Sequence, residues 1–172
     1  MKLTEKISTL EMEIALMIWV GILRNTVVPN VFWSFFNHEV DLLSVTKSGY
    51  ATEIEIKISK SDLKKDADKP HHHNSNMIKY FYFAVPDYLE EFAMEHIPER
   101  AGLLTVSKTK RTQCGGWYSK PSYYVKKVRH AKIGTVVKKW TDADMLKLNK
   151  LGTLRILGLK KKVLKYKEGE SE

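Results

Sequence analysis

The chain has 172 residues, 43% of them hydrophobic and 28% charged, which is the composition of a single globular domain and not of a disordered or fibrous chain. The longest apolar run, Ile14 to Leu23, is too short for the roughly 20 residues of a membrane span, and the lone Cys114 excludes an internal disulfide or a Cys-rich metal site. The net charge of +9 arises in residues 108–167, which hold 18 Lys or Arg against two Asp and therefore favour a polyanionic partner such as nucleic acid. Acidic residues flank the first apolar run, so no secretory leader is predicted, and we expect a cytoplasmic protein without membrane contact.

Helical and strand periods alternate along the chain, which predicts an α/β fold. Helical spacing indicates one amphipathic helix from about Thr4 to Leu23, ended by Asn25 and Pro29, and then an edge or irregular strand from Val27 to Phe36. Further strands are expected at 40–46, 50–59, 77–85 and 101–107, with helices at 60–69 and 88–96. A capping box, Thr141-x-x-Asp144, opens a basic C-terminal helix with breaks expected near Gly152 and Gly158. We expect one domain over residues 1–172, with a core at about 4–107 and a basic extension at about 108–172.

Ionisable side chains gather in two predicted strands, at 38–43 and 53–58. In the second, period-two alternation sends Glu53, Glu55 and Lys57 to one face and the isoleucines to the other. Two carboxylates on adjacent strands repel each other unless a cation lies between them. The alternative is a purely structural role, in which the two glutamates and the lysine form an exposed ladder of salt bridges.

The loop between these strands decides whether Asp41 joins them. A three-residue loop at 47–49 would pair Thr46 with Tyr50 and therefore Asp41 with Glu55. The last loop residue is a glycine, as three-residue hairpins favour. Mg²⁺ prefers oxygen ligands and is typically held by one or two carboxylates plus a phosphate. A lysine beside it can orient water and stabilise charge on the phosphate.

These residues resemble the PD-(D/E)XK superfamily of nucleases, in which Asp41 and Glu55-Ile56-Lys57 would form the signature. The stretch that follows is similar to MmcB-like putative DNA-repair endonucleases. Its matching segments are Ser59, Ser61-Asp62-Leu63, Asp66, Lys79-Tyr80-Phe81-Tyr82-Phe83-Ala84-Val85-Pro86 and Ile97-Pro98-Glu99-Arg100-Ala101-Gly102-Leu103-Leu104. The resemblance covers residues 38–107 well, the first helix loosely and the basic C-terminal third not at all. Val40 replaces the proline of the motif's name.

The resemblance implies a restriction-endonuclease-like core, a mixed β-sheet flanked by helices with the acidic face at one edge, followed here by a basic C-terminal helical region. It implies that Asp41, Glu55 and the carbonyl of Ile56 bind Mg²⁺ or Mn²⁺, with Lys57 serving the attacking water. Many members add a glutamate from the first helix. We choose Glu11, because it falls within the apolar stripe and burial of an unpaired charge is costly, although Glu13 is left open.

Other motifs are weaker. His71-His72-His73 lacks a second ligand cluster with zinc spacing and is expected to be a polar loop, and His38 is expected to be structural, on the face opposite Asp41. Aromatic residues interleaved with basic ones could stack on bases or pack in the core; they are Trp117, Tyr118, Tyr123 and Tyr124.

We therefore expect a divalent-metal-dependent nuclease that hydrolyses DNA phosphodiester bonds, with residues 108–167 holding the phosphate backbone. One alternative is a catalytically inactive nucleic-acid-binding module with a nuclease-like fold. Another is an RNA-binding protein whose carboxylates brace the sheet. The sequence leaves endonuclease or exonuclease action, and formation of a homodimer, open.

Overall fold

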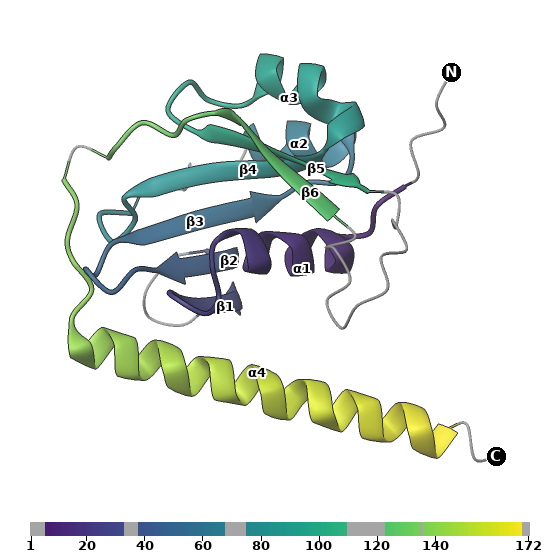
Figure 1. The fold of residues 1–172 in the computed structure, drawn as a ribbon, viewed down its shortest axis with the longest axis vertical. Helices are drawn as coiled ribbons and strands as arrows, with labels where there is room; N and C mark the ends of the chain where they lie inside the picture. Colours follow the sequence, from purple (N-terminus) through teal and green to yellow (C-terminus); the bar gives the residue numbers. More distant parts are fainter. Residues whose placement is uncertain (1–5, 33–37, 68–74, 110–122, 135, 170–172) are drawn as a thin grey trace, which may run out of the picture.

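The computed structural model describes residues 6–32, 38–67, 75–109, 123–134 and 136–169, which form an α/β fold with a six-stranded mixed sheet flanked by helices (Figure 1). The elements, in chain order, are α1 (Thr9–Trp19), β1 (Thr26–Val31), β2 (Val40–Val45), β3 (Ala51–Ile56), α2 (Lys60–Ala67), β4 (Tyr80–Pro86), η1 (Asp87–Leu89), α3 (Glu90–His96), β5 (Gly102–Lys108), β6 (Tyr123–Arg129) and α4 (Asp142–Gly169). The predicted fold class is confirmed. None of the described helices is both long and apolar enough to cross a membrane.

The strands lie in the sheet in the same order as in the chain, from β1 to β6. The first three form an antiparallel meander, whereas β3, β4 and β5 run parallel to one another. Parallel neighbours need a crossover connection. Helix α2 provides it between β3 and β4, and η1 with α3 provides it between β4 and β5. The last strand, β6, returns antiparallel to β5 and was not predicted from the sequence.

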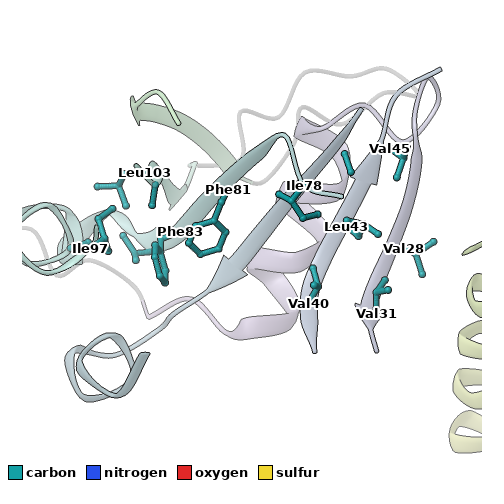
Figure 2. Packing of buried hydrophobic residues seen from close by; sticks show 14 of the residues in the cluster. Val28, Val31, Val40, Leu43, Val45, Ile78, Phe81, Phe83, Ile97 and Leu103 are labelled. Atoms are coloured by element: carbon teal, nitrogen blue, oxygen red, sulfur yellow. The ribbon is translucent and has the colours of Figure 1, made fainter. Parts of the chain in front are cut away.

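Each face of the sheet carries its own hydrophobic core. Helix α1 covers one face, where Met12, Ala15 and Leu16 pack against even-numbered strand residues such as Leu42 and Ile54. The other face bears the larger cluster, which strand residues share with α2, α3, Trp140 and the first half of α4; Figure 2 shows its members. Ala51 of β3 belongs to this second cluster, so period-two alternation assigns Glu53 and Glu55 to the same face. In β2 the alternation breaks around Asp41, because Val40 belongs to the second cluster and Leu42 to the first.

The first helix is shorter than predicted and buries a different side. It begins at Thr9, where the Ser8 hydroxyl and the Glu11 carboxylate form a capping box. It ends at Trp19, shortly before Gly21 adopts a φ of 80°. The predicted apolar stripe is wrong, because Leu10 and Ile18 are 65% and 57% exposed.

The C-terminal helix α4 is continuous, and Thr141 and Asp144 form its predicted capping box. The predicted break at Gly152 is absent because that residue lies where α4 packs on β1, and a Cβ there would lie 3.6 Å from Val28. Only the first half is covered, with Leu148 fully buried. The second half runs past the sheet (Figure 1).

Candidate active site

The hairpin between β2 and β3 has the predicted three-residue loop. The Thr46 amide donates to the Tyr50 carbonyl at 3.0 Å, and the register continues to Leu42 opposite Ile54. Gly49 adopts a φ of 80°, the left-handed conformation that only glycine adopts without strain. The same register sets Asp41 opposite Glu55, so the predicted alignment of the two strands is confirmed.

The two strands part at Asp41. Their pairing ends at Leu42. The next amide of β3 that points toward β2 is that of Ile56, and it donates to Oδ2 of Asp41 at 2.7 Å. If the pairing of the two strands continued, this amide would lie opposite Val40. The half-buried carboxylate therefore lies at the opening between β2 and β3 and is held by the backbone of the Glu55-Ile56-Lys57 segment.

Glu55 and Lys57 form an ion pair at this opening. The Lys57 ammonium lies 2.7 Å from Oε1 of Glu55, and both residues are buried, at 5% and 3% exposure. An exposed salt-bridge ladder is thus the wrong interpretation of this strand. The Glu55–Lys57 pair flanks Ile56, whose amide holds Asp41, so the three predicted residues meet where the β2–β3 pairing ends.

A second buried pair extends the cluster. His38 Nε2 lies 2.9 Å from Oε1 of Glu53, which has no exposed surface and faces the same side as Glu55. His38 was expected on the face opposite Asp41, and it lies on the face of Glu53, as the even-numbered Val40 also does. Two buried pairs, Glu55–Lys57 and Glu53–His38, therefore lie on β3, whose backbone also holds Asp41.

Glu11 does not reach the cluster, and its predicted role as a metal ligand is corrected. Its carboxylate accepts hydrogen bonds from the Ser8 amide and from the Tyr123 hydroxyl, and it pairs with Lys108 at 3.0 Å. The Ser8 amide, Lys108 and the Ser8 hydroxyl lower its pKa from 4.5 to about 2. The carboxylate caps α1 and ties that helix to β5 and β6, on the sheet face opposite Glu55.

Glu13, the other candidate of α1, contacts Asn30 of β1. Burial raises the pKa of its carboxyl, and a hydrogen bond with the Asn30 side chain opposes that rise in part. Asn30 stands opposite Asp41, between the pairs Pro29–Leu42 and Val31–Val40. It has a φ of 51°, which is unusual for a residue other than glycine. The sequence did not reveal the contact between Glu13 and Asn30, because it depends on how the end of β1 lies against α1.

The donor set suits magnesium better than zinc. Within the described ranges, no group of three or more His, Cys, Asp or Glu side chains is arranged to hold a metal ion. Mg²⁺ commonly keeps several waters and takes only one or two carboxylates together with substrate phosphate oxygens. Asp41, Glu55 and the Ile56 carbonyl could serve such an ion, since the Ile56 amide holds Asp41 beside the strand that carries Glu55.

Several basic residues of the C-terminal third have partners within the protein. Lys126 pairs with Glu90, and Lys132 pairs with Glu99. The Arg129 guanidinium donates to the carbonyls of Ala101 and Pro98, and burial lowers its pKa.

By contrast, the lysines on the second half of α4 are exposed and have no acidic partner among the described residues; they are Lys160, Lys161, Lys162 and Lys165. Two of the four interleaved aromatic residues are described, and they differ. Tyr123 packs beside α1, whereas Tyr124 is 58% exposed. His71-His72-His73, Trp117 and Tyr118 lie outside the described residues.

No family model matches the chain, and no curated protein is significantly similar to it. Among solved structures, the chain is similar to the SPO1766 protein of unknown function from Silicibacter pomeroyi, at 19% identity and a TM-score of 0.52. The similarity covers 87% of this chain and 86% of that one. At this identity it supports a shared fold and carries no statement about function.

Proposed function

We propose that the protein is a divalent-metal-dependent deoxyribonuclease of the PD-(D/E)XK type, with a restriction-endonuclease-like core. The observation that carries the proposal is the convergence of Asp41, Glu55 and Lys57 where β2 and β3 part. A buried cluster of carboxylates is electrostatically unfavourable unless a cation accompanies it. A bound divalent cation would offset the charges of Asp41 and Glu55.

Asp41, Glu55 and the Ile56 carbonyl would hold Mg²⁺ or Mn²⁺. Such an ion, when bound, supplies Lewis-acid stabilisation of the charge that develops on the phosphoryl group. In the reaction, water attacks phosphorus and the bond from phosphorus to the leaving sugar oxygen breaks. The Lys57 ammonium would orient that water and stabilise the phosphoryl oxygens, an effect that burial strengthens. The Ile56 amide keeps Asp41 at the opening.

The position of α4 supports a DNA substrate. The helix begins at the β2–β3 hairpin, where the Trp140 amide donates to the Gly49 carbonyl, and passes Asn30, whose carbonyl accepts from Arg155. Residues 156–169 continue for about 20 Å past the end of the sheet at which Asp41 and Glu55 lie (Figure 1). Their exposed lysines would attract the phosphate backbone beside the site.

Cleavage assays with linear, circular, single-stranded and branched DNA test the proposal. Each substrate is incubated with Mg²⁺, with Mn²⁺ or with EDTA. Metal-dependent cleavage of at least one DNA, together with lack of cleavage in EDTA, is expected. Retained DNA binding without cleavage of any substrate would instead identify an inactive nucleic-acid-binding module. Cleavage of RNA alone would overturn the choice of substrate.

A further inference from the structure

The sheet face that α1 covers holds a second site, on the side opposite the acidic cluster. Under α1 the strands contribute aliphatic side chains to the core, such as Leu42 and Ile54. Beyond Trp19, where α1 ends, the same faces of β2 and β3 change to hydroxyl-bearing residues: Ser44, Thr46 and Thr52. A pocket of about 400 Å³ opens there, which is within the size range of ligand sites.

Aromatic rings form the walls of this pocket. Trp19 and Tyr82 meet edge to face with centroids 6.5 Å apart, and Tyr80 lies two residues before Tyr82 on the same side of β4. Gly102 on β5 makes the arrangement possible, because a Cβ there would lie 2.2 Å from the Tyr82 ring. The absence of a side chain at position 102 lets the ring lean over β5.

Two basic residues complete the pocket. The Lys127 ammonium lies 5.4 Å from the centre of the Trp19 ring and 5.9 Å from that of Tyr82. The exposed His130 lines the same pocket. The preceding lysine on β6, Lys126, pairs with Glu90 of α3, so adjacent lysines serve opposite faces of the sheet.

We propose that this pocket binds one nucleotide unit. Aromatic rings stack on bases of any sequence, hydroxyls can hydrogen-bond to base or sugar edges, and Lys127 with His130 can pair with the phosphate. The unit is either a free nucleotide or one nucleotide of a single strand, since both present the same base, sugar and phosphate. This site lies across the sheet from Asp41, Glu55 and Lys57, so the inference does not rest on the proposed nuclease activity.

Binding of deoxyadenosine monophosphate and of single-stranded oligodeoxyadenylate, measured in EDTA by tryptophan fluorescence and calorimetry, tests the inference. Trp19→Ala should weaken binding about tenfold, the loss expected for one base stack. Lys127→Gln should weaken it similarly. The matched control is Lys126→Gln, which removes the same charge from the neighbouring position on the other face and should bind as the wild type does. Trp19→Phe, which keeps a ring, should retain most of the affinity.

If the mononucleotide binds, and Trp19→Ala and Lys127→Gln weaken that binding while Lys126→Gln does not, the ligand is a free nucleotide. If only the oligonucleotide binds in this way, the ligand is a single strand. Equal affinities for Lys127→Gln and Lys126→Gln would overturn the inference. The inference would also be overturned if Trp19→Ala bound as tightly as the wild type, or if the wild type bound neither ligand.

Discussion

Removal of both partners of the Glu55–Lys57 pair should cost clearly less stability than the sum of the two single removals. The two groups lie 2.7 Å apart, with side chains only 4% and 6% exposed. Breaking a buried pair on one side typically costs about 3–5 kcal/mol. Lys57→Met should cost more than Glu55→Gln, because it leaves the buried Glu55 carboxylate without its lysine, whereas glutamine is neutral. The double variant should recover about 2–3 kcal/mol of the summed loss.

Urea unfolding in EDTA, followed by circular dichroism, provides the four free energies of unfolding. The internal control is the exposed pair Lys126–Glu90, with side chains 53% and 32% exposed. Its coupling should stay below about 1 kcal/mol, as is usual for surface ion pairs. A coupling between Glu55 and Lys57 no larger than that of the control pair would refute their placement together in a buried site.

Two further predictions concern α4 and α1. Replacing Lys160, Lys161 and Lys162 by Glu should weaken DNA binding for all sequences alike, with little change in turnover at saturating DNA. The wild-type plot of log affinity against log salt concentration should have a slope of about −4 to −5, and the triple variant should have a flatter one. An unchanged slope would show that the DNA-binding surface lies elsewhere. The stability that Glu11 contributes should be present above pH 4.5 and lost as pH falls towards its folded pKa of about 2. The difference in melting temperature between wild type and Glu11→Gln should therefore shrink over that range, and a constant difference would contradict the paired carboxylate. Cleavage should survive Glu11→Gln but decrease in Glu13→Gln.

The candidate site could be predicted from the sequence where its geometry is local. The loop at 47–49 determines the hairpin register, and strand alternation then orders Glu53, Glu55 and Lys57. These are short-range effects of turn chemistry and backbone period. The position of His38 was not predicted, because the alternation of β2 breaks between Val40 and Leu42.

The long-range contacts were also beyond prediction. Apolar residues surround α1 on several sides, so the sequence did not reveal that Met12 and Leu16 face the core while Leu10 and Ile18 face solvent. Strand β6 was missed because exposed Tyr124, Lys126 and Lys127 leave it little apolar alternation, and pairing with β5 defines it. Helix α4 spans Gly152 because packing outweighs the weak helical propensity of glycine.

Cleavage and DNA binding by Glu55→Ala, measured on one preparation, test the central claim most directly. Glu39→Ala, which removes an exposed acid two residues before Asp41, is the matched control. The predicted result is that Glu55→Ala abolishes Mg²⁺-dependent cleavage and keeps or increases DNA affinity, because a negative charge that faces phosphate is removed. Glu39→Ala should behave as the wild type does. Cleavage by Glu55→Ala at the wild-type rate would contradict the account.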